Sequence, residues 1–121
     1  MRIFSVVVSA FLLATTLQSQ QRQMCKGNPD VVDQCFIFHG RVRIVNGAGM
    51  VIWRIGTNRI VEVEDEDNVP GNLRKALFKY DELGNDVYGD FEVCPLTKNK
   101  PGEMQMVCME SASHLVAKKN P

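Results

Sequence analysis

The sequence predicts a mainly β protein, a small five-stranded barrel with one short helix. Hydrophobic residues alternate with a period of two in five stretches, and one stretch between the third and fourth has the helical period instead. The length of 121 residues suits one domain. The resulting order β-β-β-α-β-β is that of the OB-fold, a Greek-key barrel. A β-sandwich, or an open sheet on one helix, has a similar pattern.

Residues 1–19 are expected to be a signal peptide. Arg2 precedes an apolar run from Ile3 to Leu13, and small and polar residues follow it. The run is shorter than the roughly 20 residues that span a bilayer. An uncleaved amphipathic anchor is the alternative, although the run has no polar face. We therefore expect a secreted or periplasmic protein with no integral membrane segment after cleavage.

The rest of the chain divides into three parts. Residues 20–35 are polar and are expected to form an extended leader. Residues 36–117 carry all the alternating stretches and form the single OB-like domain. Residues 118–121 are a tail.

All four cysteines follow the predicted signal peptide. They are Cys25, Cys35, Cys94 and Cys108. An even number in a short exported chain predicts two disulfides. The alternation places Cys94 and Cys108 on the outward face of two strands, where their side chains are within reach of each other. We therefore expect the pairs Cys94–Cys108 and Cys25–Cys35, although the sequence alone allows three pairings.

Three strands are expected at 36–46, 50–55 and 59–64, and together they form a meander. Asn46-Gly47 and Gly56 mark the turns between them, because Asn and Gly tolerate a positive φ. The side chains expected inside are those of Phe36, Phe38, Val42, Ile44, Val51, Trp53, Ile55, Val61 and Val63. Those expected outside are His39, Arg41, Arg43, Ile52, Arg54, Glu62 and Glu64.

A short amphipathic helix is expected from Asn72 to Leu83, with Asn68 or Asn72 at its start and Gly84 at its end. Two further strands follow. The first covers 87–95, with Val87, Phe91 and Val93 inside and Asp90, Glu92 and Cys94 outside. The second covers 104–110, with Val107 and Met109 inside. A separate short element is expected at 114–117.

The charge balance excludes a polybasic nucleic-acid binder. The chain has 14 Lys+Arg and 14 Asp+Glu, and loss of Arg2 leaves 13 against 14, a net charge of −1. We expect a protein or small-molecule partner, no nucleic acid and no cofactor. The acidic run from Glu62 to Asp67 lacks the spacing of a calcium loop and is interpreted as solvated.

Four cations and one aromatic residue are the candidate ligand-binding group. They are Arg41, Arg43, Trp53, Arg54 and Arg59. On an OB-like barrel the sheet of strands two and three is the usual ligand face, and such residues suit anionic or planar ligands. In the alternative interpretation Arg43 and Arg54 pair with Glu62 and Glu64, and Trp53 belongs to the core.

A copper site is a second hypothesis. Thioether and imidazole groups suit Cu(I), and Met104, Met106 and His39 supply them. Small periplasmic copper carriers of OB-like fold use a Met-x-Met pair with a His and a Trp, and this composition resembles theirs. Here the methionine pair falls on the last strand, and methionines also fill irregular cores.

No catalytic motif is present. His39 and His114 are the only histidines, and neither accompanies a recognised nucleophile motif. We therefore expect a non-enzymatic exported binding or interaction module. A hydrolase or nuclease with an unrecognised site is a third hypothesis.

Five stretches resemble a pattern found in small exported bacterial proteins of uncharacterised function. They are Gly40-Arg41, Asn46-Gly47, residues 52–59, residues 90–95 and residues 104–112. The resemblance covers most of the chain after the leader. It implies an export-competent single domain and no particular activity.

Overall fold

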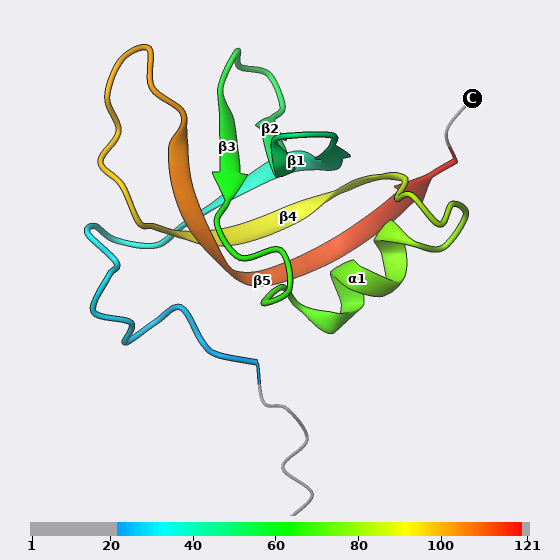
Figure 1. Ribbon diagram of the computed structural model, residues 1–121, viewed down its shortest axis with the longest axis horizontal. Helices are drawn as coiled ribbons and strands as arrows, with labels where there is room; N and C mark the ends of the chain where they lie inside the picture. Colours follow the sequence, from blue (N-terminus) through cyan, green and yellow to red (C-terminus); the bar gives the residue numbers. More distant parts are fainter. Residues whose placement is uncertain (1–21, 120–121) are drawn as a thin grey trace, which may run out of the picture.

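The computed structural model describes residues 22–119, and the predicted signal peptide at 1–19 lies outside the described residues (Figure 1). The elements are β1 (Phe36–Val45), β2 (Gly49–Arg54), β3 (Ile60–Val63), α1 (Gly71–Leu77), β4 (Asp86–Pro95) and β5 (Gln105–Lys118). The predicted order is therefore confirmed. Residues 22–35 form neither helix nor strand. No helix in the described part has the length and apolarity needed to cross a membrane.

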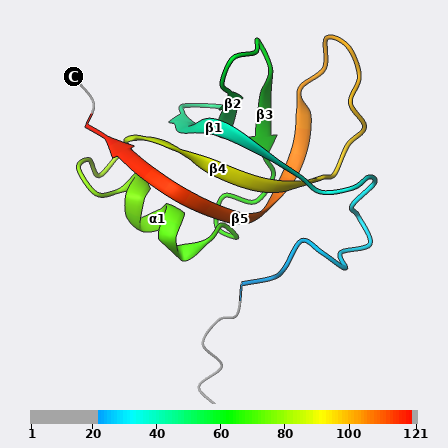
Figure 2. The same cartoon turned by 180° about the vertical axis from the view of Figure 1, so that it is seen from behind.

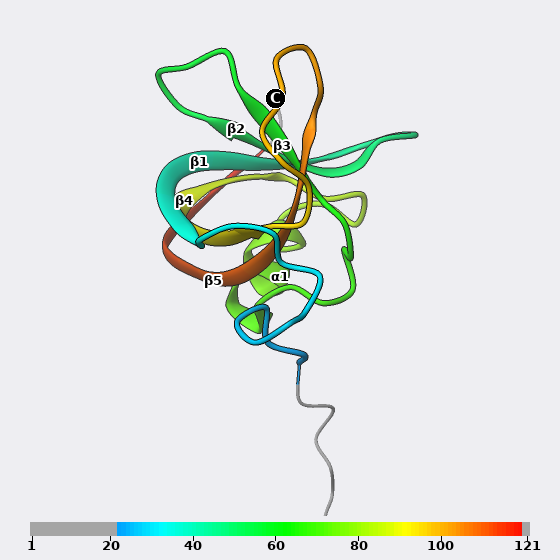
Figure 3. The same ribbon diagram turned by 90° about the vertical axis from the view of Figure 1, so that its left-hand side faces the viewer.

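The strands close into a barrel in the order β1-β2-β3-β5-β4. Neighbouring strands are antiparallel except for β3 and β5, which run parallel, and β1 pairs with β4 to close the barrel. Figure 3 shows β1 and β5 curving around the interior. The predicted five-stranded OB-like barrel with one helix is confirmed.

The core fills the barrel and continues to the helix. Its buried side chains in the barrel are Phe38, Val42, Met50, Ile52, Val61, Val63, Val87, Phe91, Val93, Val107 and Met109. α1 packs against β4 and β5 through Leu73 and Leu77, both fully buried (Figure 2). The helix and the β2–β3 turn lie at opposite ends of the barrel (Figure 1).

The helix ends at Leu77, earlier than the predicted Leu83, because a buried asparagine binds its last turn. The backbone N–H of Asn85 donates to the carbonyl of Leu77 at 2.7 Å, and its side-chain amide donates to the carbonyl of Ala76 at 2.9 Å. These contacts satisfy carbonyls that would otherwise lack a partner at a helix end. The predicted start is also corrected, because Pro70 occupies the N-cap and no side chain caps it.

The predicted orientation of β2 is wrong. Met50 and Ile52 are buried inside, whereas Val51 and Trp53 are only partly buried on the outer surface. The pairing with β1 places Val42 opposite Ile52, and residues opposite each other in a sheet share a face. Because Val42 faces the core, Ile52 faces it too, and Trp53 faces outward.

β5 is longer than predicted and contains the separate element expected at 114–117. Its pairing with β4 shifts in register between Tyr88 and Asp90. His114 adopts a φ of 52°, and both Ser113 and His114 are exposed. This bulge places two successive side chains outside, so the strict alternation of the sequence pattern ends there.

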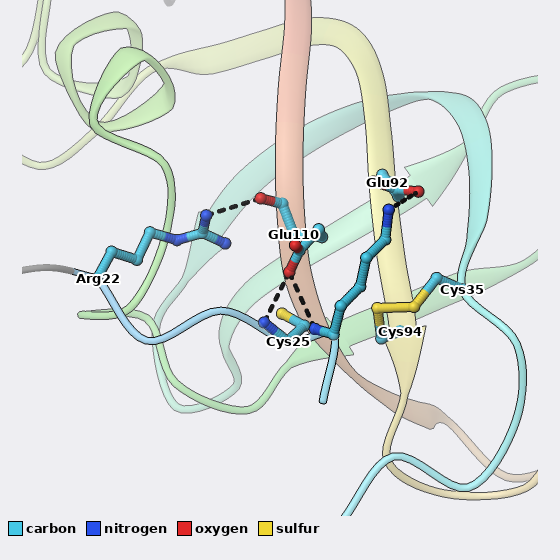
Figure 4. Close-up of polar contacts among 7 residues, drawn as sticks. Arg22, Cys25, Cys35, Glu92, Cys94 and Glu110 are labelled. Atoms are coloured by element: carbon cyan, nitrogen blue, oxygen red, sulfur yellow. Dashed lines mark hydrogen bonds and ion pairs between the residues drawn. A yellow bond between two sulfur atoms is a disulfide. The ribbon is translucent and has the colours of Figure 1, made fainter. Parts of the chain in front are cut away.

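Two disulfides are present as predicted, but their connectivity differs from the prediction. Cys25 bonds Cys108, and Cys35 bonds Cys94. Cys94 and Cys108 are opposite each other in the β4–β5 ladder, yet each bonds to the leader; Figure 4 shows the Cys35–Cys94 bridge. The leader crosses the outer side of these strands and brings its own cysteines to them.

The observed connectivity constrains the chain more than the predicted one. The bonded residues are 83 and 59 positions apart. In the loop-entropy model each of the two observed disulfides contributes about 4 kcal/mol to the free energy of unfolding. Each of the two shorter loops of the predicted pairing would contribute about 3 kcal/mol. Two disulfides fit an oxidising extracellular compartment.

Polar contacts around Glu110 also hold the leader against β5 (Figure 4). The buried carboxylate of Glu110 accepts hydrogen bonds from the backbone N–H groups of Cys25 at 2.6 Å and Lys26 at 3.3 Å. The Arg22 guanidinium donates to the backbone carbonyls of Met109 and Glu110. Docking of the leader therefore uses hydrogen bonds as well as sulfur bridges.

We expect Glu110→Leu to lower the free energy of unfolding by about 2 kcal/mol, because it leaves the buried Cys25 N–H without an acceptor. Glu110→Gln keeps an oxygen acceptor and is expected to cost less. Urea unfolding with intact disulfides measures both. Glu82→Leu on an exposed position is the matched control, and equal losses in the Glu110 and Glu82 variants would contradict the assigned role.

Candidate ligand-binding face

A row of side chains crosses three strands on the outer surface of the barrel. Arg41 of β1 is opposite Trp53 of β2, and Trp53 is opposite Ile60 of β3. Residues in such a row stand side by side on one face of the sheet. Trp53 stands in this row because β2 faces the core with Met50 and Ile52, opposite to the predicted orientation.

Arg41 and Trp53 are in direct contact. The guanidinium carbon of Arg41 lies 5.0 Å from the centroid of the indole ring, which is a cation–π geometry. The indole N–H donates to the backbone carbonyl of Thr57 at 2.7 Å, and this bond fixes the ring against the β2–β3 turn. The buried Nε of Arg41 has no hydrogen-bond partner within the described residues. The carboxylate oxygen Oδ2 of Asp86 lies 4.0 Å from that Nε, which is an ion-pair distance.

Two neighbouring hollows lie along this row. The first has a volume of about 350 Å³ and is lined by Arg41, Trp53, Asn58 and Ile60. The second, a groove of about 740 Å³, lies between the β2–β3 turn and the β4–β5 loop. Its lining residues are Asn58, Arg59, Ile60, Asn99, Lys100, Pro101, Gly102, Glu103 and Met104. Asn58 and Ile60 line both hollows, so the two are adjacent.

The two loops that form the groove project from the same end of the barrel (Figures 1 and 3). Arg59 connects them, because its guanidinium donates to the side-chain carbonyl of Asn99 at 2.5 Å. Arg59 and Lys100 are basic, and Glu103 is the one acidic residue of the groove lining. Ile60 and Met104 are 43% and 47% exposed and give the groove an apolar surface.

The structure brings together three of the five predicted ligand-binding residues: Arg41, Trp53 and Arg59. Arg43 and Arg54 lie elsewhere. Arg43 binds Asp86 through two hydrogen bonds of 2.9 and 2.7 Å. The Arg54 guanidinium lies 5.8 Å from the ring centroid of Phe38. The alternative in which Arg43 pairs with Glu62 or Glu64 is therefore wrong, and so is the placement of Trp53 in the core.

The lining residues that the sequence did not predict include Asn58, Asn99 and Lys100. Each belongs to a segment that the sequence marks only as a polar turn or loop. Their proximity follows from the parallel pairing of β3 with β5, which begins at Val61 opposite Gln105. A pattern of local periodicity carries no signal for that pairing.

The residues of the copper hypothesis lie on different strand pairs. Met106 of β5 is opposite Glu62 of β3, whereas His39 of β1 is opposite Asp90 of β4. Met104 lines the groove. Among the described residues, Cys25, Cys94 and Glu110 have ligand atoms within 4.8 Å of one another. Both of these cysteines are in disulfides and offer no thiolate to a metal.

Both histidines of the chain bind one carboxylate on the outer surface. The Nδ1 atoms of His39 and His114 each lie 3.0 Å from a different oxygen of Asp90. The hydrogen bond from His39, supported by that from His114, lowers the pKa of Asp90 below its ordinary value. No hydroxyl group of residues 22–119 is hydrogen-bonded to either imidazole. The trio joins β1, β4 and β5 and lacks the nucleophile of a catalytic triad.

The carboxylate of Asp86 forms ion pairs with two neighbouring arginines, Arg43 at 2.7 Å and Arg41 at 4.0 Å. Its hydrogen bonds from Arg43 lower its pKa below the ordinary value of 3.8, partial burial opposes this shift, and the charges of Arg43 and Arg41 reinforce it. A carboxylate with a lowered pKa contributes stability above the ordinary pKa and loses it as the pH falls through the lowered one.

We therefore expect Asp86→Asn to lower the free energy of unfolding at pH 7 by about 1 kcal/mol. The difference from the wild type should shrink as the pH falls below about 4, where the unfolded carboxylate becomes protonated, and through the lowered pKa of the native carboxylate. Urea unfolding at neutral and acidic pH measures it. Asp30→Asn, at an exposed position without an ion pair among the described residues, is the control. A difference that stays constant with pH would refute the assignment.

Comparison of the chain with protein-family models gives no match. Comparison with curated proteins gives none either. The same holds for comparison with solved structures.

Proposed function

We propose that the protein is an exported, non-enzymatic binding module that takes an anionic ligand on the outer face of β1, β2 and β3. The single observation that carries this proposal is the pair of adjacent hollows, one lined by Arg41 and Trp53 and the other by Arg59 and Lys100. Cations beside an exposed aromatic ring suit ligands that combine negative charge with an apolar surface.

The place of the hollows on the fold supports the proposal. In five-stranded barrels of this topology, the face of strands two and three and the adjoining loops are the usual ligand sites. Here Trp53 comes from β2, Ile60 from β3 and Lys100 from the β4–β5 loop. Fold analogy alone fixes no function, so the proposal depends on these side chains.

The non-enzymatic part of the proposal is supported by the composition of the site. The lining of both hollows includes one carboxylate, Glu103, and no histidine, cysteine or serine. Acid–base and nucleophilic catalysis most often use a histidine, cysteine or serine beside a second such group, and the lining has no such pair. The two histidines are bound to Asp90 outside the hollows.

The exported part of the proposal is supported by the sulfur chemistry. Both leader cysteines are bonded to the barrel, and within the described residues no cysteine is free. Such bridges persist in oxidising compartments outside the cytoplasm. The apolar run near the start of the chain agrees with this location.

The test is a nuclear magnetic resonance titration with glucuronate and phosphate as anionic probes and glucose as a neutral one. We expect the anions to shift the amide signals of residues 41, 53, 58–60, 99, 100 and 102–104, because these line the hollows. Glucose should shift them less. Shifts that cluster on α1 or on the acidic loop at 64–67, or no shifts at all, would count against the proposal.

A charge-matched pair of variants sharpens the test. Arg59→Glu reverses a cation in the groove, and Lys75→Glu makes the same change on the exposed side of α1. We expect the first to weaken anion binding by about tenfold or more, since a charge-assisted hydrogen bond becomes a repulsion. The second should leave binding unchanged. Equal effects would indicate a response to net charge alone.

A further inference from the structure

We propose that the two disulfides form a single thiol–disulfide exchange site, which a small thiol enters through a hollow beside Cys108. The site is separate from the ligand-binding face, because all four cysteines lie in the leader or on β4 and β5. The proposal follows from the proximity of the two bridges, from the unequal burial of the four cysteines and from the hollow itself.

The two bridges are close enough to react with each other. The Sγ atoms of Cys25 and Cys94, one from each bridge, lie within 4.8 Å of each other and of a carboxylate oxygen of Glu110 (Figure 4). A disulfide bond is about 2 Å long, so these two sulfurs reach bonding distance by a shift of less than about 3 Å. A thiolate released at Cys25 therefore has the second bridge as a neighbouring electrophile.

Burial decides which sulfur an external thiol reaches. Cys25 and Cys94 have no exposed surface, whereas Cys35 and Cys108 are only partly buried. Cys108 also lines a hollow of about 240 Å³, together with Asn28 of the leader. Because this volume accommodates a thiol of the size of free cysteine, we assign the first attack to the Sγ of Cys108.

The exchange begins when an external thiolate attacks the Sγ of Cys108. The Cys25–Cys108 bond breaks, and its electron pair leaves on Cys25. That thiolate attacks the Sγ of Cys94 and forms a Cys25–Cys94 bond. The electron pair of the broken Cys35–Cys94 bond leaves on Cys35, which takes a proton from water.

A second external thiolate then completes the reaction. It attacks the external sulfur bound to Cys108, and the Cys108 thiolate that leaves is protonated by water. Two external thiols are thereby oxidised to one disulfide, and the protein gains two electrons and two protons. The leader stays attached to the barrel, because the new bridge joins Cys25 to β4.

The surroundings of Cys25 favour the internal step. A thiolate at Cys25 is buried and close to the carboxylate of Glu110, and both burial and a like charge disfavour the charged form. Cys35 is nearer to solvent. The exchange therefore moves the negative charge to a better hydrated sulfur.

The test is limited reduction of the oxidised protein with cysteamine, followed by alkylation with N-ethylmaleimide and disulfide mapping by mass spectrometry. The tryptic cleavage sites that separate the four cysteines into four peptides follow Lys26, Lys79 and Lys98. We expect the form with two alkylated thiols to contain the new Cys25–Cys94 bridge, with the label on Cys35 and Cys108.

Every other product would overturn the proposal. Label on Cys25 and Cys108 would show that the second bridge does not react with the released thiolate. Label on Cys35 and Cys94 would show that the thiol enters at Cys35. No reduction at a cysteamine concentration that reduces oxidised glutathione would show that the hollow admits no thiol.

A Cys35→Ser variant tests the internal step without an external thiol. It leaves Cys94 as a thiol beside the Cys25–Cys108 bridge, so we expect Cys25 to be bonded to Cys108 in part of the protein and to Cys94 in the rest. Ser113→Cys, which adds a thiol at an exposed position of β5, is the control and should keep both native bridges. Exclusive Cys25–Cys108 pairing in Cys35→Ser would contradict the exchange.

The charge of the hollow predicts a preference among thiols. Glu64 and Asp65 line it, and within the described residues no basic side chain does. At equal thiolate concentrations, cysteamine should therefore react about fivefold faster than 2-mercaptoethanesulfonate. Glu64→Gln should lower this preference by about twofold, and Glu82→Gln at an exposed position elsewhere should not change it. Equal rates for the two thiols would refute entry through the hollow.

Discussion

The parallel pairing of β3 with β5 is the constraint on which the candidate site depends. It joins the β1–β2–β3 meander to β5 and sets Val61 opposite Gln105, so the residues that precede these two positions must also lie near each other. Those residues are the β2–β3 turn and the β4–β5 loop, which line the groove. Each loop alone is an ordinary polar turn. The groove exists because a long-range strand pairing, maintained by the buried interior, juxtaposes them (Figure 3).

Local periodicity was sufficient to predict the elements of this fold but not the side of β2 that faces the core. β1 and β4 carry apolar residues on one face and polar residues on the other, so their orientation was predicted correctly. In β2 both faces are apolar, Met50 and Ile52 on one and Val51 and Trp53 on the other. Only the register with β1, which sets Val42 opposite Ile52, decides between them. The consequence for function is large, because it moves Trp53 from the core to the surface.

The disulfide connectivity also could not be predicted from local periodicity. The strand pattern correctly placed Cys94 and Cys108 opposite each other on the outer side of β4 and β5. The path of the leader was not encoded in any periodic pattern, so its cysteines were paired with each other by proximity in the sequence. In the structure, Glu110 and both bridges hold the leader over these strands. The leader therefore covers one side of the barrel and leaves the face of β1, β2 and β3 accessible.

The distribution of carboxylates explains why that accessible face retains positive charge. Asp86 makes both of its short hydrogen bonds to Arg43, and the Nε of Arg41 remains 4.0 Å away with no hydrogen-bond partner in the described structure. An unsatisfied buried donor costs free energy, so the Nε of Arg41 is a local cost to stability. Stacking on Trp53 stabilises the guanidinium without using its donors. The face thus keeps a guanidinium that is positioned by the indole ring and lies at ion-pair distance from Asp86.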